Sequence, residues 1–224
     1  MYAIEVHELT RRYGYRVALR NVSFTIATGG IHALFGANGA GKTTLMRVIS
    51  TLLQPHGGYA RVYSLDTQEE PLKVKEKIGV VGDKPLLYGE LTGRENLRFY
   101  STLYGLARSV ADERIENLAD RFGVKSWLDE PTKILSTGLR KRFDIIRSVL
   151  HDPEVYLLDE PFAGLDKDST EVFKEFIESH RSDRTVLLTT HNLALGSEMS
   201  DDYITLKMGK VLSHGPISQF DGVI

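Results

Sequence analysis

Short apolar runs alternate with helical patterns along the chain, and most of the apolar runs end in polar loops. The first two runs, at residues 4–6 and 22–26, alternate apolar with polar residues, which is typical of half-buried antiparallel strands. Continuous apolar runs then indicate strands that are buried on both faces. These runs lie at residues 31–35, 78–81, 155–158 and 186–188, and a closing pair of strands is expected at 203–206 and 210–212.

The middle of the chain, about 90–151, has helical periodicity. Ile115, Leu118 and Phe122 share one helical face, and Gly123 is placed to end that helix. A serine at 109 and an aspartate at 112 predict a capping box at its start.

A second helix is predicted by apolar residues at spacings of four, three and four, namely Leu139, Phe143, Ile146 and Leu150. We therefore expect one α/β domain over residues 1–224, with a mostly parallel sheet, a small antiparallel β lobe and a helical lobe inserted at about 90–151. For these two helices a plain packing role, with no further task, stays open.

Composition narrows the function classes. The chain has 224 residues, 42% of them hydrophobic, and a formal net charge of −2, so binding along a nucleic-acid backbone is not favoured. It has no cysteine, which excludes disulfides, thiolate metal sites and thiol catalysis. The longest stretch without charge, 22–41, is too polar and glycine-rich to span a bilayer. We expect no secretory signal and a cytosolic location, with a membrane partner left open.

A phosphate-binding loop follows the run at 31–35 and precedes an amphipathic helix, which is the context that the pattern G-x-x-x-x-G-K-[ST] requires. Backbone N–H groups and the helix N-terminus would wrap a phosphate chain. Lys42 would reach the β and γ phosphates, and the Thr43 hydroxyl would hold Mg²⁺. The matching residues are Gly36, Ala37, Asn38, Gly39, Ala40, Gly41, Lys42 and Thr43.

Two acidic residues end the apolar run at 155–158. In a parallel sheet, this end of the strand lies beside the phosphate loop. Asp159 is then placed to support Mg²⁺ through water, and Glu160 can polarise an attacking water. An ordinary strand end followed by two acids remains the alternative when this pair is taken alone.

Four motifs in fixed order carry a family resemblance: GANGAGKTT, LSTGLRKR, YLLDEPFAGLD and the histidine of TTH. With them, essentially the whole chain resembles the ATP-binding subunits of ATP-binding-cassette (ABC) transporters. The resemblance implies a P-loop NTPase with a RecA-like core, ATP and Mg²⁺ as ligands, and ATPase activity. It also extends the phosphate-binding residues to Thr44.

The resemblance further implies a head-to-tail dimer around two ATP molecules. One subunit would supply the phosphate loop and the other the signature, here Ser136, Thr137 and Gly138. Asp166 would contact the opposite subunit. Taken alone, Ser136 is better explained as a plain helix N-cap.

Two further residues match positions of the family's nucleotide site. His191 would reach the γ-phosphate and orient the water, and Tyr13 would stack on adenine. An exposed tyrosine at a turn is the alternative for Tyr13. With Lys42 and Glu160, His191 completes the residues that we expect to be catalytic.

One position departs from the family pattern. Asp83 stands where a glutamine is usual, at the end of the strand 78–81. A carboxylate can still bind Mg²⁺, but an ionised one cannot donate a hydrogen bond to the water. A loop-capping role that points Asp83 to solvent is the alternative.

The segment 86–97 resembles the family branch that exports drugs, polysaccharides or lipids. In that branch it forms a groove for a helix of an integral membrane permease, and candidate lining residues are Leu86, Leu87, Tyr88 and Leu91. Packing inside the helical lobe is the alternative for each. The implied partners are that permease and a second copy or a paralogous ATP-binding subunit, at the cytoplasmic face of the membrane.

Two other functions compete with that of a transporter motor. An ATPase of DNA repair or ribosome rescue would carry long coiled coils, cysteine zinc modules or two cassettes, and the sequence has none of these. A degenerate cassette that binds ATP as a regulatory clamp is favoured by Asp83 alone. We therefore expect the motor subunit of an exporter, although the cargo does not follow from the sequence.

Overall fold

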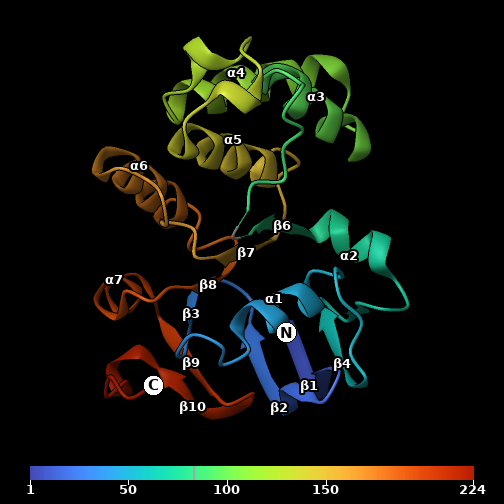
Figure 1. Ribbon diagram of the computed structural model, residues 1–224, viewed down its shortest axis with the longest axis vertical. Helices are drawn as coiled ribbons and strands as arrows, with labels where there is room; N and C mark the ends of the chain where they lie inside the picture. The colour runs from blue at the N-terminus through green and yellow to red at the C-terminus, as the bar shows by residue number, and fades with distance from the viewer. Residues whose placement is uncertain (83) are drawn as a thin grey trace.

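The computed structural model describes residues 1–82 and 84–224, so the prediction made for Asp83 lies outside the described residues. Two sheets and the helix between them form the lower part of the molecule, and a group of helices stands above them (Figure 1). This arrangement confirms the expected α/β fold with a helical lobe inserted into a sheet core.

The smaller sheet is antiparallel, with the strand order β2-β1-β4-β5. Its strands are β1 (Tyr2–Tyr13), β2 (Arg16–Ala27), β4 (Gly57–Val62) and β5 (Leu65–Asp66). Alternate residues of β2 are buried, among them Val22, Phe24 and Ile26, which confirms the predicted half-buried strands. The apolar pattern did not predict β4 and β5, because one opens with two glycines and the other is very short.

The larger sheet has the order β10-β9-β3-β8-β7-β6, with every pair parallel except the final hairpin of β9 and β10. Its strands are β3 (Ile31–Phe35), β6 (Ile78–Val81), β7 (Val155–Asp159), β8 (Thr185–Thr189), β9 (Asp202–Lys207) and β10 (Lys210–Pro216). Every residue of β3, β7 and β8 is buried, so the prediction from continuous apolar runs is confirmed.

The helix α1 (Lys42–Ile49) lies between the two sheets, as Figure 1 shows. Its residues Leu45, Met46, Val48 and Ile49 are buried in one apolar cluster with side chains of both sheets. Burial of these side chains on both sides holds the start of α1, and with it the preceding loop, in a fixed place. The helix α2 (Pro71–Lys77) leads from the smaller sheet to β6.

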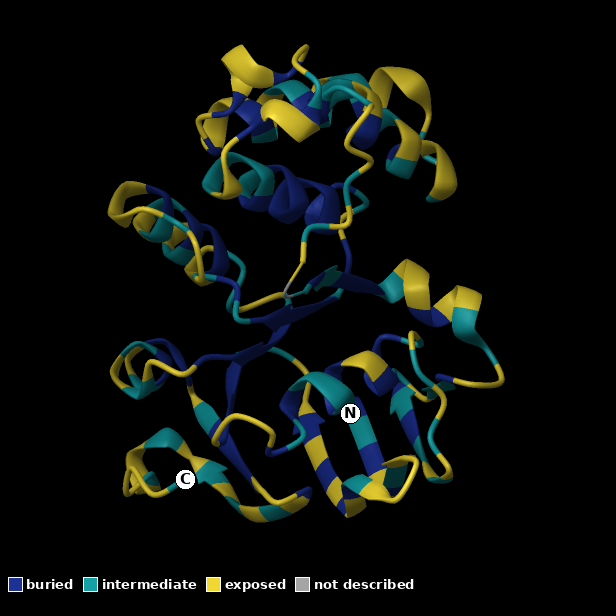
Figure 2. Ribbon diagram, in the orientation of Figure 1, coloured by how far each residue is buried: buried dark blue, intermediate teal, exposed yellow. Residues whose placement is uncertain are grey.

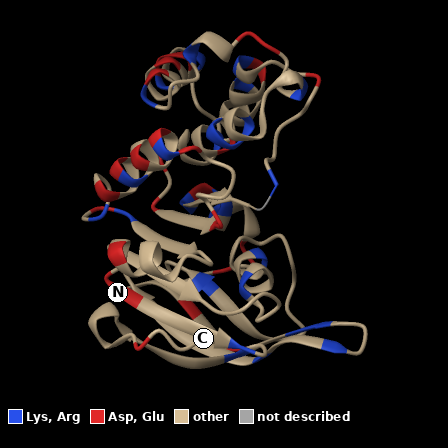
Figure 3. Cartoon of the chain, turned by 60° about the vertical axis from the view of Figure 1, so that its left-hand side comes forward, with Lys and Arg blue, Asp and Glu red and all other residues tan. Residues whose placement is uncertain are grey.

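The helical lobe contains α3 (Gly93–Leu103), α4 (Arg108–Arg121) and α5 (Thr137–Val149), with two short 3-10 helices at Lys125–Trp127 and Thr132–Ile134. The remaining helices are α6 (Lys167–Glu178), α7 (Leu193–Met199) and a 3-10 turn at Ile217–Gln219. Within the described residues, no helix combines the length and apolar character needed to cross a membrane. Acidic and basic residues are interspersed over the helices (Figure 3).

The capping box predicted at Ser109 and Asp112 is wrong, because α4 begins at Arg108, two residues earlier than that assignment requires. The Asp112 carboxylate instead accepts a hydrogen bond from the Arg98 guanidinium at 2.7 Å. A capping box is present at the start of α3, where the side chains of Thr92 and Glu95 each accept from the other residue's backbone N–H. Gly123, with φ 63°, follows the end of α4 as predicted.

Candidate functional site

The phosphate loop connects the buried end of β3 to α1, and its glycines are required by their surroundings. A side chain at Gly36 would overlap the backbone carbonyl oxygen of Leu206. At Gly41, where φ is 117°, a Cβ would lie 2.8 Å from the carbonyl oxygen of Ala18. Only glycine meets both the close approach and the positive φ, so neighbouring strands hold the loop in its shape.

Lys42, the first residue of α1, lies back over the loop. Its ammonium group donates to the carbonyl oxygen of Gly36 at 2.5 Å and reaches that of Ala37 at 3.4 Å. The side chain is almost completely buried. A buried ammonium costs free energy unless it is hydrogen-bonded, so these carbonyl groups stabilise the cation where a phosphate would approach.

An open pocket of about 430 Å³ lies over the loop and brings the phosphate loop and both acids together. It is lined by Tyr13, Arg16, Ala18, Asn38, Gly39, Gly41, Lys42, Thr43, Thr44, Asp159 and Glu160. Ala40 lies beneath the loop, where its carbonyl oxygen accepts from the N–H of Gly209 at 2.9 Å. The sequence reasoning identified every lining residue except Arg16 and Ala18.

The acidic pair at the end of β7 is held by Thr189 of β8. The Thr189 hydroxyl donates to the Asp159 carboxylate at 2.6 Å and accepts from the backbone N–H of Glu160 at 3.0 Å. Glu160 has a positive φ of 48°, an uncommon conformation for a residue with a side chain. A strained turn fixed by a neighbouring strand is typical of functional sites. The sequence did not indicate this role for Thr189, because the residue lies in an otherwise apolar strand and belongs to no motif.

His191 lies beside Glu160. Its Nδ1 is 2.9 Å from a carboxylate oxygen of Glu160, and three quarters of its side chain is exposed. This contact joins the loop after β8 to the turn after β7. The two residues, which we expect at one site from their motifs, therefore lie side by side. The ring itself, unlike Glu160, does not line the pocket.

Oxygen donors suited to a magnesium ion are present at this site. Thr43 and Asp159 line the same pocket, and hydroxyl and carboxylate oxygens are the ligands that Mg²⁺ prefers. In the part of the chain that the structure describes, no group of three His, Cys, Asp or Glu residues could hold a metal by itself. Such a site would need oxygens from the nucleotide, as is usual for Mg²⁺ bound with phosphates.

The signature residues do not line this pocket. Ser136 is the N-cap of α5, and its hydroxyl accepts from the N–H of Leu139 at 3.2 Å. Thr137 and Gly138 begin that helix and lie against Gly164 in the loop before α6. Within one chain, the structure therefore keeps the start of α5 apart from the phosphate loop and leaves Ser136, which is exposed, facing outward.

Asp166 has a structural partner inside the chain. As the N-cap of α6 it accepts from the N–H of Ser169 at 2.8 Å, and its other carboxylate oxygen pairs with Arg142 of α5 at 2.7 Å. Hydrogen bonds from Ser169 together with the Arg142 charge lower the pKa of this carboxyl. The residue thus connects the signature helix to α6, a role that the sequence did not indicate.

Tyr13 ends β1 at the rim of the pocket with close to half of its surface exposed. The guanidinium of Arg11 lies 5.3 Å from the ring centre and is itself fixed by a bond of 2.7 Å to the carbonyl oxygen of Gln54. Such a cation–π contact restricts the ring while leaving aromatic surface for a ligand.

The helix α5 contains buried charged groups that the apolar stripe did not predict to be buried, and Figure 2 shows most of this helix as buried. Arg147 donates to Asp144 at 2.8 Å and to the carbonyl oxygen of Val80 at 2.5 Å. Asp144 accepts from the N–H of Leu86 at 3.0 Å, and Lys141 donates to the carbonyl oxygen of Gly82 at 2.9 Å. The network joins α5 to the end of β6.

A second hollow, of about 260 Å³, lies between α1, the end of β6 and the segment that follows it. Leu86 lines it opposite Leu52, and both side chains are exposed. Tyr88 is exposed and packs edge-on against Phe99 of α3, with 5.1 Å between the ring centres. Of the other groove candidates, Leu87 packs against the apolar core and Leu91 is half-buried.

Comparisons with known proteins agree on one family. The family model described as "ABC transporter" matches residues 19–163. The chain is 39% identical to the ABC transporter ATP-binding protein NatA of Bacillus subtilis (strain 168), over 89% of this chain and 82% of that protein. It is 36% identical to the daunorubicin resistance ATP-binding protein DrrA3 of Streptomyces coeruleorubidus, over 95% of this chain and 68% of that protein.

Solved structures give the same result. The structure of an ATP-binding subunit of an ABC transporter is similar with a TM-score of 0.89 and 29% identity, over 96% of this chain and 90% of that one. A dimeric ATP-binding cassette in a post-hydrolysis state, bound to ADP and Pi, has a TM-score of 0.88 at 22% identity, over 97% of this chain and all of that one. At 22% identity, the likeness to this dimeric cassette supports the fold alone.

Proposed function

The chain belongs to the ABC transporters as an ATP-binding and ATP-hydrolysing subunit, and on this premise we propose that two such subunits close head-to-tail around two ATP molecules. The second subunit is another copy or a paralogue. Closing and reopening of this dimer drives a separate permease in the membrane. Export is the direction that the likeness to a daunorubicin resistance protein favours.

ATP is bound over the phosphate loop. The loop's N–H groups surround the phosphate chain, and Lys42 exchanges its carbonyl partners in the loop for phosphate oxygens. Asn38 and Thr44 line the same pocket beside the loop glycines. Adenine stacks on Tyr13 at the rim, where the aromatic surface is exposed.

Thr43 and Asp159 would hold Mg²⁺ together with phosphate oxygens, and their shared place in the pocket supports this. When bound, the ion neutralises charge that develops on the phosphates. Thr189 keeps the Asp159 carboxylate oriented through the bond of 2.6 Å. A place for Asp83 in the metal shell is part of the same proposal and rests on its sequence position.

Hydrolysis is an in-line attack of water on the γ-phosphate. Glu160 accepts the proton of that water, and His191 orients the carboxylate and reaches the γ-phosphate. The observation that supports these roles best is the contact of 2.9 Å between the two side chains at the edge of the pocket that holds Lys42. Glu160 and His191, which one catalytic site would need together, are thus adjacent although they follow different strands.

The position of the signature supports the dimer. Because the start of α5 does not line the chain's own pocket, Ser136, Thr137 and Gly138 can serve a phosphate only in a partner subunit. There the helix N-terminus and the serine hydroxyl meet the γ-phosphate. Asp166, which is mostly exposed while it caps α6, contacts the partner beside the signature.

The permease docks in the hollow beside the helical lobe, at the cytoplasmic face of the membrane. Leu52 and Leu86 are exposed apolar side chains that line it, as a groove that receives a helix needs, and Tyr88 is exposed two residues after Leu86. Leu87 packs against the apolar core, and neither Leu87 nor Leu91 lines the hollow.

The test is the variant Glu160→Gln, which keeps the shape but cannot accept the proton. We expect turnover to fall by about 10²- to 10⁴-fold with ATP binding retained, and an ATP-dependent dimer to accumulate in size-exclusion chromatography. The matched control is Glu198→Gln on α7, an exposed glutamate paired with Lys174, which should hydrolyse ATP at the rate of the unmodified protein. Unchanged turnover in Glu160→Gln would remove this residue from the role.

A further inference from the structure

Arg16 lies at the nucleotide pocket and has no role in the function described so far. It is the first residue of β2 and stands directly opposite Tyr13 of β1 in the strand register. Residues that face each other in an antiparallel pair project their side chains to the same side. Accordingly, both side chains line the 430 Å³ pocket.

The guanidinium of Arg16 reaches the phosphate loop itself. Its Nη2 atom is 3.1 Å from the point where a side chain at Gly39 would place its Cβ. Gly39 belongs to the part of the loop whose N–H groups surround the phosphate chain. Arg16 therefore brings a positive charge to the loop, in the pocket that Tyr13 and Lys42 also line.

This charge has no partner within the described part of the chain. Arg16 is exposed, and neither a hydrogen bond nor an ion pair involves its guanidinium there. The neighbouring Arg11 differs, because its guanidinium is fixed to the carbonyl oxygen of Gln54 and lies over Tyr13. The hairpin thus uses one arginine to hold the aromatic ring and leaves the other open to the pocket.

We propose that Arg16 is a further nucleotide-binding residue, which binds the phosphate chain from the side opposite the loop's N–H groups. Its planar guanidinium can donate two parallel hydrogen bonds to phosphate oxygens, a geometry that an ammonium cannot match. The proposal rests on ATP binding over the phosphate loop. It adds that β2 recognises the phosphate chain directly.

The test measures the affinity for ADP and for pyrophosphate by titration calorimetry, since neither ligand is hydrolysed at the γ-phosphate. In Arg16→Gln, both affinities should fall by about three- to tenfold, a size expected for an exposed, charge-assisted contact. Arg16→Lys should recover part of the loss, because the charge returns without the paired donors. Added salt should narrow the difference between the unmodified protein and Arg16→Gln.

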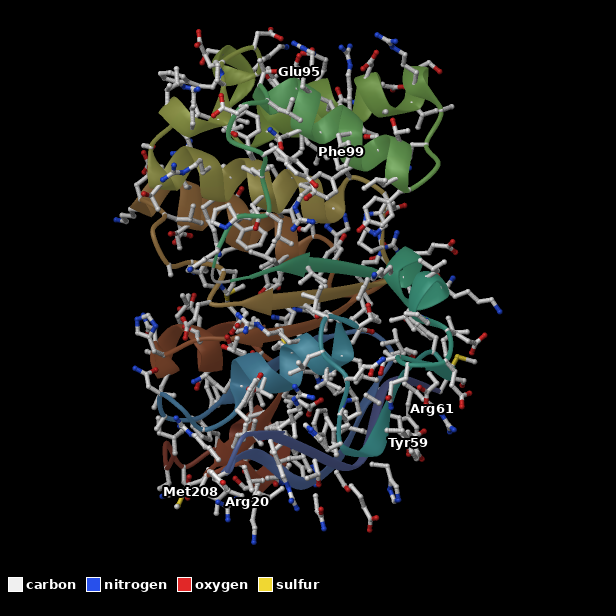
Figure 4. All side chains as sticks on the ribbon, turned by 45° about the vertical axis from the view of Figure 1, so that its right-hand side comes forward. Arg20, Tyr59, Arg61, Glu95, Phe99 and Met208 are labelled. Atoms are coloured by element: carbon white, nitrogen blue, oxygen red, sulfur yellow. The ribbon has the colours of Figure 1, made fainter. Side chains whose placement is uncertain are left out.

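The matched control is Arg20→Gln on the same strand. Arg20 is exposed too, but it lies beside Met208 and lines a different hollow (Figure 4). It should bind both ligands as the unmodified protein does. Thermal unfolding without nucleotide should be equal for both variants.

Three results would overturn the proposal. The first is unchanged binding in Arg16→Gln, and the second is an equal loss in Arg20→Gln. The third is a loss for ADP without a loss for pyrophosphate, which would mean that Arg16 only positions Tyr13 for the base. Failure of the unmodified protein to bind either ligand would instead overturn the ATP site itself.

Discussion

Side chains of the nucleotide pocket depend on partners that do not line the pocket themselves. Thr189 orients Asp159 and the backbone of Glu160, and Arg11 fixes the ring of Tyr13. Thr189 comes from a different strand, β8, whereas Arg11 lies on the same strand as Tyr13. A substitution at Thr189 or Arg11 should therefore alter the site without removing any group that touches the nucleotide.

Tyr13 gives the first prediction at the scale of single residues. Tyr13→Ala should weaken ATP binding by about ten- to a hundredfold, because it removes the stacking surface. Tyr13→Phe should be nearly neutral, since the ring remains and the Arg11 contact with it. Titration of both variants with ATP decides the role, and equal affinities for the two would place Tyr13 at the surface without a ligand.

His151 gives a prediction about pH. Its ring stacks on Tyr104 with 3.6 Å between centres, and burial lowers its pKa to about 4. The unfolded chain, with an ordinary histidine pKa of about 6.5, binds the proton more readily, so acid favours unfolding. This stability is complete above about pH 6.5 and is lost as the pH falls towards 4, by about 3 kcal/mol at most.

Urea denaturation at pH 7 and at pH 4.5 measures the effect. The free energy of unfolding should fall less between these pH values in His151→Phe, which keeps the stacking surface but has no titrating group. His214→Phe, on an exposed part of β10, should keep the drop of the unmodified protein. An identical drop in all three proteins would show that another group controls the acid sensitivity.

At the scale of elements, α5 is held by a buried pair of charges. Arg147 and Asp144 are both almost inaccessible, and each also bonds to the backbone near the end of β6. Removing one partner of such a pair leaves an uncompensated buried charge. Arg147→Met should therefore lower the free energy of unfolding by about 3–5 kcal/mol.

The control for Arg147 is an exposed pair with the same spacing. Lys73 and Glu70 lie three residues apart with 2.8 Å between their charged atoms. Lys73→Met should cost less than about 1 kcal/mol, because solvent screens the pair. Both values come from denaturant titrations, and similar costs for the two variants would mean that the charges on α5 do not stabilise the fold.

The sequence predicted those elements whose signal is local. The phosphate loop, the strand β7 and its acids, and the stop at Gly123 follow from residue types at fixed spacings. The capping box was misplaced because the Ser109 pattern lacks the local contacts that Thr92 and Glu95 make. Such a pattern permits a cap, but tertiary packing decides where the helix begins.

The buried charges of α5 and the hydroxyl of Thr189 could not be predicted for another reason. Their partners are backbone groups and carboxylates of strands that are far away in sequence. A polar residue off the apolar stripe is expected at the surface, and only the neighbouring strand supplies the bonds that make its burial acceptable. Arg16 belongs to the same class, because its place over Gly39 follows from the register of the hairpin.

At the scale of the whole molecule, the separation of the signature from the pocket predicts complementation between subunits. In a head-to-tail dimer, Lys42→Ala inactivates the site to which its chain contributes the phosphate loop. Gly138→Asp inactivates the site to which its chain contributes the signature. Mixed dimers of the two variants keep one site with both parts intact. Mixing equal amounts should therefore restore ATP hydrolysis to about a quarter of the unmodified rate.

The matched control for complementation carries both changes in one chain and is mixed with unmodified protein. Its mixed dimers contain no intact site, so only the unmodified dimers hydrolyse ATP. When the mixed dimers are purified before the assay, those of Lys42→Ala with Gly138→Asp should hydrolyse ATP, and those of the control should not. The reverse result, with hydrolysis by the control's mixed dimers and none by mixed dimers of Lys42→Ala with Gly138→Asp, would show that each site is completed within a single chain.

The strand order has a consequence for biosynthesis. β3 lies in the interior of its sheet, but its neighbours β8 and β9 come from the last fifth of the chain. At about 5–20 residues per second, a ribosome needs roughly 10–30 s between completing β3 and completing β8. Through that interval, a strand that is completely buried in the folded chain has both edges unpaired. Nascent chains should therefore depend on chaperones until their final strands emerge, and ATP can act as a ligand that favours the folded state only afterwards.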